Sequence, residues 1–97
     1  MSDKIMTLHP DPAKQGVNID RAKYDVVKAA ILELLTEHGE LTFSALTTAV
    51  NDRLQGTFDG SVSWYVVTVK LDLEARGVVE RAKQSGQQIV RLPKTAE

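Results

Sequence analysis

Cysteine is absent from the sequence, which excludes disulfide bonds, cysteine-ligated zinc, iron–sulfur clusters and thiol catalysis. Long apolar runs are also missing, because none approaches the roughly 18–20 residues that span a bilayer. The polar start at Met1-Ser2-Asp3-Lys4, with Asp11 and Pro12 close behind, leaves no place for the apolar core of a signal peptide. We therefore expect a cytoplasmic protein.

Neither sign of charge is in excess, since the sequence has 12 Lys and Arg and 13 Asp and Glu, which give a net charge of −1. This balance argues against a wholly basic nucleic-acid coat and against a membrane-surface peptide. The 97 residues suit one small domain, and 42% hydrophobic with 26% charged residues is an ordinary globular composition.

Arrangements typical of catalysis are missing as well. His9 and His38 are far apart in the sequence, and neither has an acidic partner at ligand spacing. The loop at 56–60 contains two glycines but lacks the Lys-Ser/Thr of a phosphate-binding loop, and Ser44 has no nucleophile-elbow context. We expect neither an enzyme nor a bound cofactor, metal or small molecule.

What is present is a pattern of apolar stripes and turn residues that predicts three helices followed by a hairpin. The predicted helices cover 21–38 after the N-cap Asp20, about 43–54 after the N-cap Thr42, and 61–76, with stops at Gly39, Gln55-Gly56 and Gly77. The predicted strands cover 78–82 and 88–92 around a turn at Ser85-Gly86. We place the domain at 20–93, between a partly extended N-terminal arm at 1–19 and a frayed tail at 94–97.

The third helix is ambiguous on local grounds, because the segment from Trp64 to Val69 is rich in residues that favour strands. We prefer a helix, since 61–76 is too long for a strand in so small a domain and Leu73-Glu74-Ala75-Arg76-Gly77 is a good helix ending.

This order of elements resembles that of winged helix-turn-helix domains. The resemblance is carried by Leu73-Glu74-Ala75-Arg76-Gly77-Val78-Val79-Glu80-Arg81 and by Leu41-Thr42-Phe43-Ser44-Ala45-Leu46. More closely, Gly60-Ser61, Trp64-Tyr65 and the run from Val69 to Gly77 resemble a family of short bacterial proteins with no assigned activity. The resemblance implies an α+β fold of three helices followed by a two-stranded antiparallel wing. It also implies a regulator of transcription whose third helix enters the DNA major groove.

The chemistry of the third helix does not match a DNA reader. On a helical wheel, Val62, Val66, Val69 and Leu73 form the inward stripe, and the opposite face carries Trp64, Val67 and Leu71. Base reading needs Arg, Lys, Asn or Gln, and Lys70 alone offers a cation there. An apolar face of this kind more often marks a covered surface or a protein interface. The cover is either the N-terminal segment, through Ile5, Met6, Leu8 and Val17, or a second copy of the chain.

The predicted wing, unlike the apolar face of the third helix, is basic. Between residues 76 and 94 the cations Arg76, Arg81, Lys83, Arg91 and Lys94 face one acid, Glu80, so this segment carries +4 and the remainder carries −5. Such a hairpin could contact a phosphate backbone. Alternatively, it is a solvated hairpin whose charges keep its edge strands from aggregating. Arg76 also follows Asp72 by one helical turn, so it is either part of this surface or half of a structural ion pair.

Two functions remain open from the sequence. The first is a small nucleic-acid-binding regulator or accessory protein, with DNA as the expected partner. Its predicted contact residues are Ser63, Thr68, Lys70, Arg81, Lys83, Arg91 and Lys94. The second is a protein-interaction or homodimerisation module on the same fold, with Trp64, Val67 and Leu71 at its interface.

Overall fold

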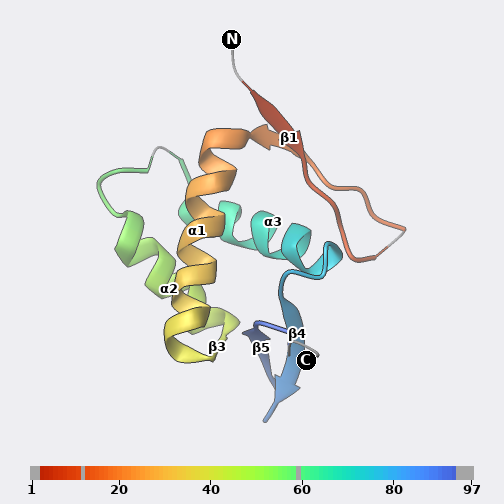
Figure 1. The fold of residues 1–97 in the computed structure, drawn as a ribbon, viewed down its shortest axis with the longest axis vertical. Coiled ribbons are helices and arrows are strands. Elements are labelled where there is room, and N and C mark those ends of the chain that lie inside the picture. The colour runs from red at the N-terminus through yellow and green to blue at the C-terminus, as the bar shows by residue number, and fades with distance from the viewer. Residues whose placement is uncertain (1–2, 12, 59, 94–97) are drawn as a thin grey trace.

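The computed structural model describes residues 3–11, 13–58 and 60–93, and these form a mixed α+β fold of three helices and two small antiparallel sheets (Figure 1). The helices are α1 (Arg21–His38), α2 (Phe43–Leu54) and α3 (Val62–Ala75). The strands are β1 (Lys4–Met6), β2 (Asn18–Asp20), β3 (Glu40–Thr42), β4 (Glu80–Gln84) and β5 (Gln87–Arg91). Within the described residues, no helix is both long and apolar enough to cross a membrane. The predicted frayed tail at 94–97 lies outside them.

Side-chain caps set where each helix begins. Asp20, Thr42 and Ser61 each accept a backbone N–H from the first turn of α1, α2 and α3, at 3.2, 3.0 and 3.2 Å. Gly39 ends α1 with φ at 82°, a conformation that favours glycine, and its N–H donates to the Leu35 carbonyl at 2.8 Å. The predicted caps at Asp20 and Thr42 and the stop at Gly39 are confirmed.

The three helices bury their predicted stripes against one another. The buried side chains are Tyr24, Val27, Ile31, Leu34 and Leu35 of α1, Leu46, Val50 and Leu54 of α2, and Val62, Val66, Val69 and Leu73 of α3. The segment from Trp64 to Val69 is helical despite its β-forming residues, because tertiary packing outweighs local propensity. Burial of this stripe also decides which side of α3 faces outward.

The larger sheet corrects the two-stranded wing expected from the sequence, because β3 adds a third strand and the order is β3-β5-β4. Leu41 of β3 pairs with Val90 of β5, whose other neighbour is Arg81 of β4. This addition removes an unpaired edge from β5 and connects the β4–β5 hairpin to the helices. The hairpin turn has Ser85 at φ 52° and Gly86 at φ 79°, and positive φ at both positions matches the right-handed twist of the strands.

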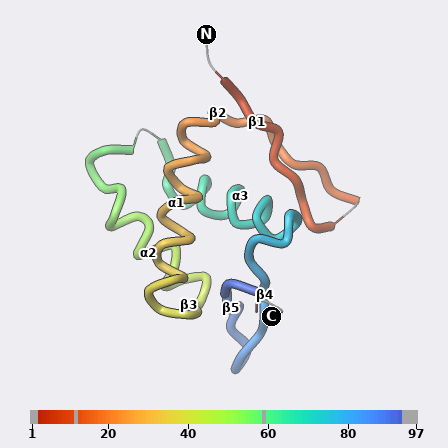
Figure 2. Tube along the Cα trace, in the orientation of Figure 1, coloured from red at the N-terminus to blue at the C-terminus, as the bar shows by residue number. Residues whose placement is uncertain are grey.

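The N-terminal arm forms the second sheet, in which β1 pairs with β2 immediately before α1 (Figure 2). Thr7 fastens the arm beyond these strands, since its N–H and hydroxyl both donate to the Val17 carbonyl and its Oγ1 accepts the Val17 N–H at 2.8 Å. The chain packs too closely here for a side chain at Gly16, where a Cβ would lie 1.8 Å from the Thr7 carbonyl oxygen. The described residues of the arm are therefore held together by the β1–β2 pairing and by the contacts of Thr7 with Val17.

Candidate interaction surface on helix α3 and the wing

The outward side of α3 carries a row of apolar residues. Trp64 and Val67 are 47% and 40% exposed, and Leu71 is partly buried. Their i, i+3, i+7 spacing places them along one line on the helix, which we call the α3 ridge. Single exposed apolar side chains are ordinary, whereas neighbouring ones that include a tryptophan are typical of interaction surfaces.

Lys70 does not project from α3. Its side chain is buried, with Nζ 2.8 Å from Glu74 Oε2, 5.0 Å from the centroid of the Phe43 ring and donating to Gln88 Oε1 at 2.5 Å. Glu74 Oε2 has no hydrogen-bond partner, so its contact with Lys70 is an ion pair. The ammonium group therefore joins α3 to α2 and β5.

The other two polar residues predicted to face a DNA groove differ in exposure. Ser63 is exposed, and Thr68 is 9% exposed. All residues of α3 are described, and none of them places a basic side chain on the outward face. Bidentate reading of base edges needs Arg, Lys, Asn or Gln, and the α3 ridge offers none of these side chains.

An aromatic cluster supports the N-terminal end of the α3 ridge. The Tyr65 ring stands edge-on to Trp64 at 5.0 Å between centroids and edge-on to Phe58 at 5.1 Å. Lys23 Nζ lies 5.8 and 5.7 Å from the Phe58 and Tyr65 centroids, within range of a cation–π attraction. Phe58 is partly buried and packs against the core. These contacts fix the orientation of Trp64 while leaving half of its surface exposed.

The N-terminal arm covers the other end of the α3 ridge. Leu8 and Val17 line a hollow together with Thr68 and Leu71. Leu8 and Val17 are themselves 43% and 40% exposed, so they extend the apolar surface of the α3 ridge. The arm thus contacts the C-terminal half of α3 and leaves Trp64 and Val67 exposed. Of the other arm residues expected to form a cover, Ile5 packs on the core and Met6 is 58% exposed.

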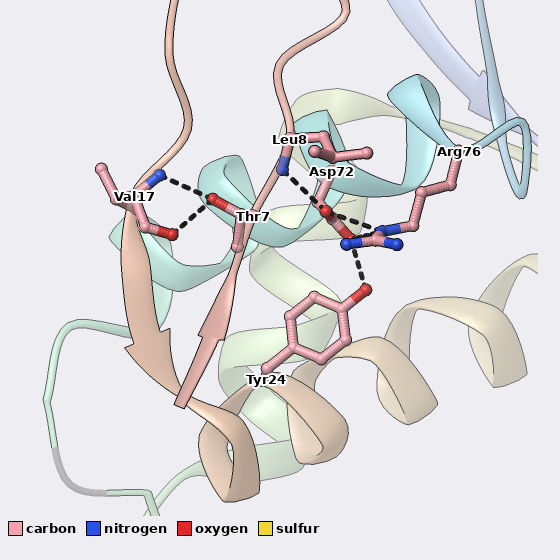
Figure 3. A network of polar contacts seen from close by, with 6 residues as sticks. All are labelled: Thr7, Leu8, Val17, Tyr24, Asp72 and Arg76. Carbon is pink, nitrogen blue, oxygen red and sulfur yellow. Dashed lines mark hydrogen bonds and ion pairs between the residues drawn. The ribbon is translucent and has the colours of Figure 1, made fainter. Parts of the chain in front are cut away.

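A buried carboxylate attaches the arm to α3 (Figure 3). Asp72 is fully buried and accepts the Leu8 N–H at 2.8 Å, the Tyr24 hydroxyl, and Arg76 Nε at 2.9 Å to each carboxylate oxygen. The Asp72–Arg76 ion pair confirms the structural alternative considered for Arg76. Because the donors come from the arm, α1 and α3, one side chain determines how these three segments are placed.

The same cluster shifts the ionisation of its partners. Burial, together with the hydrogen bond to Asp72, raises the pKa of the Tyr24 hydroxyl to about 12. The hydrogen bond to Asp72 raises the pKa of the Arg76 guanidinium further above its usual range. Tyr24 therefore stays a neutral donor, and Arg76 stays a cation, throughout the physiological pH range.

The cations of the β4–β5 hairpin, which the sequence predicted as a wing, differ in their surroundings. Arg81 and Lys83 of the outer strand β4 are exposed and line a groove with Ala82 and Gln88. Arg91 is also exposed, with Nε 3.3 Å from Glu80 Oε1. Lys94 lies outside the described residues. Arg81 and Lys83 are thus the described wing residues best placed to meet an anionic partner.

Sequence reasoning missed two features of this surface, the inward Lys70 and the attachment of the arm by Asp72. The partners Gln88, Tyr24 and Leu8 are distant in sequence from α3, so no local pattern marks them. Across the parts of the chain that the structure describes, no three His, Asp or Glu residues cluster as metal ligands would.

Comparison with known proteins identifies a family and no activity. No curated protein matches the chain, and no solved structure matches it. A family model described as a family of unknown function, DUF6958, matches residues 4–89, which include the three helices, strands β1 to β4 and the first part of β5. The chain belongs to this family, DUF6958, whose function is unknown.

Proposed function

We propose that this protein is a winged-helix interaction module that binds a partner protein through the α3 ridge. The single observation that carries the proposal is the exposure of Trp64 and Val67 on α3 while Lys70 is buried. The winged-helix assignment is supported by the hairpin that follows α3 and by β3, which lies between α1 and α2 and pairs with that hairpin.

The contrast with a DNA reader is energetic as well as chemical. An exposed tryptophan beside an exposed valine gains free energy when a partner removes both from water, and tryptophan is prominent among residues that dominate interfaces. In the major groove the same side chains would displace hydrated base edges without replacing their hydrogen bonds.

Site-specific photo-crosslinking in the native cell tests the proposal. A photoreactive amino acid at position 67 should give a discrete protein adduct, and Trp64→Glu should abolish it. The matched control is position 26, because Val26 is a valine of similar exposure, 45%, on α1. The proposal is refuted when position 67 gives no protein adduct, or gives the same adducts as position 26.

A second candidate function is contact between the wing and a phosphate backbone, favoured by the exposure of Arg81 and Lys83. Such binding would be independent of sequence and would weaken as salt rises. Fluorescence anisotropy with duplex DNA should then show a salt slope that falls by about 2 in Arg81→Ala/Lys83→Ala, one unit for each lost phosphate contact. Arg53→Ala is the control, since Arg53 is paired with Glu33 on the helices. Absence of binding at low salt would eliminate this candidate.

A further inference from the structure

The charges around the α3 ridge differ from those of the chain as a whole. Both carboxylates of α3, Asp72 and Glu74, have buried side chains and lie in ion pairs. The exposed surface of α3 is therefore free of negative side-chain charge, although the chain carries a net charge of −1. A partner approaching this helix meets apolar side chains and no carboxylate of α3.

One lysine lies near each end of the α3 ridge. At the N-terminal end, Lys23 stands over the Tyr65 ring, which itself contacts Trp64. The first turn of α3 contains no acidic residue, so the positive end of its helix dipole is not neutralised from within that turn. At the C-terminal end, the exposed Lys14 of the arm borders a hollow together with Leu8 and Ala75.

If α3 binds a partner protein, as proposed above, we propose that the segment it binds is an acidic amphipathic helix. Its apolar side chains cover Trp64, Val67 and Leu71, and its flanking carboxylates face Lys23 and Lys14. A row of three apolar residues at helical spacing matches the i, i+3, i+4, i+7 face of such a segment. Carboxylates complement the lysine near each end of the α3 ridge, whereas a basic segment would meet like charge at both lysines.

A pair of designed peptides tests the sign of the partner's charge. Both probes are about 15 residues long, with leucine at i, i+3, i+4 and i+7 spacing, and the remaining positions are mostly glutamate in one and lysine in the other. The chain contains a single tryptophan, so its emission reports the α3 ridge directly. We expect the acidic probe to shift the Trp64 emission to shorter wavelength and the basic probe to leave it unchanged.

Variants connect the signal to the proposed contacts. Val67→Asp should abolish the shift while keeping the fluorophore, and Val26→Asp on α1 should not. Lys23→Glu should weaken the acidic probe roughly threefold or more, because one exposed pair is lost and a repulsion replaces it. Lys83→Glu makes the same charge change on the wing and should have no effect. Circular dichroism shows that each variant is folded, and Lys23→Glu supplies the test if Val67→Asp does not fold.

Three results overturn this inference. The first is equal or tighter binding of the basic probe, and the second is failure of the acidic probe to bind. The third is a dimer in light scattering that Val67→Asp dissociates, because the α3 ridge would then be covered by a second copy of the chain. A protein adduct at position 67 combined with failure of the acidic probe would reject the acidic partner and leave the proposed function standing.

Discussion

Replacement of Asp72 by asparagine tests whether one buried carboxylate holds the arm, α1 and α3 together. The substitution preserves the shape of the side chain but removes its charge and turns one acceptor oxygen into an N–H donor. The Tyr24 hydroxyl, the Leu8 N–H and the Arg76 guanidinium all donate to Asp72, so at least one of them must face another donor. The loss is therefore larger than that of a single neutral hydrogen bond.

The magnitude follows from which donors can reach water. The Arg76 side chain is 39% exposed and can turn outward, so its lost pairing costs less than a buried pair would. Tyr24 is 3% exposed and cannot be hydrated without rearrangement. The main cost therefore comes from the Tyr24 hydroxyl and the Leu8 N–H, which lose a charged acceptor, and we expect Asp72→Asn to lower the free energy of unfolding by roughly 2–4 kcal/mol.

Urea unfolding followed by circular dichroism measures the effect. Arg76→Ala should cost about 3 kcal/mol, because it leaves the fully buried Asp72 carboxylate with only the neutral donors of Leu8 and Tyr24. Amide exchange should show loss of protection at Leu8 in Asp72→Asn, since its N–H then lacks a charged acceptor. A loss of less than about 1 kcal/mol would contradict this reasoning, because it would fall below the cost of one buried unpaired group.

Three further substitutions extend the account. The pKa of Tyr24 is raised from 10.0 to about 12, so its contribution to stability is complete below pH 10 and is lost between pH 10 and about pH 12. Tyr65→Phe leaves Tyr24 as the one tyrosine of the chain, and its tyrosinate absorbance should then rise near pH 12. A rise near pH 10 would show that Tyr24 is not held by Asp72. Gly16→Ala should cost about 1–3 kcal/mol in urea unfolding, since its Cβ would collide with the Thr7 carbonyl, and a neutral result would show that the arm can shift freely. Lys70→Met should lower the free energy of unfolding by about 3–5 kcal/mol, because it leaves the buried Glu74 carboxylate without its cation. The double variant Lys70→Met/Glu74→Leu should recover most of this loss. Additive losses would show that the two charges are not coupled.

Local patterns were sufficient to predict the helices because caps and apolar stripes act over a few residues. Asp20, Thr42 and Gly39 lie within one turn of the groups they satisfy, so their positions alone indicate where α1 and α2 begin and where α1 ends. The three-residue strand β3 was harder to place, because it becomes a strand through its pairing with β5.

The candidate site was only partly predictable for a related reason. Trp64 and Val67 were correctly placed on the side of α3 opposite the core, because helical periodicity fixes that geometry. Lys70 sits at the edge between the two sides, and its long side chain can turn either way. Its direction depends on Glu74, Phe43 and Gln88, which come from three elements, so it was determined by the assembled fold.

The chemical nature of the adduct formed at position 67 is the most direct measurement of the central claim. A photoreactive residue there, activated in the native cell, reports what touches the α3 ridge. We predict an adduct that protease destroys, that nuclease leaves intact and that is lost in Trp64→Glu. An adduct removed by nuclease would place nucleic acid on α3 and contradict the assignment of the ridge as a protein-binding surface.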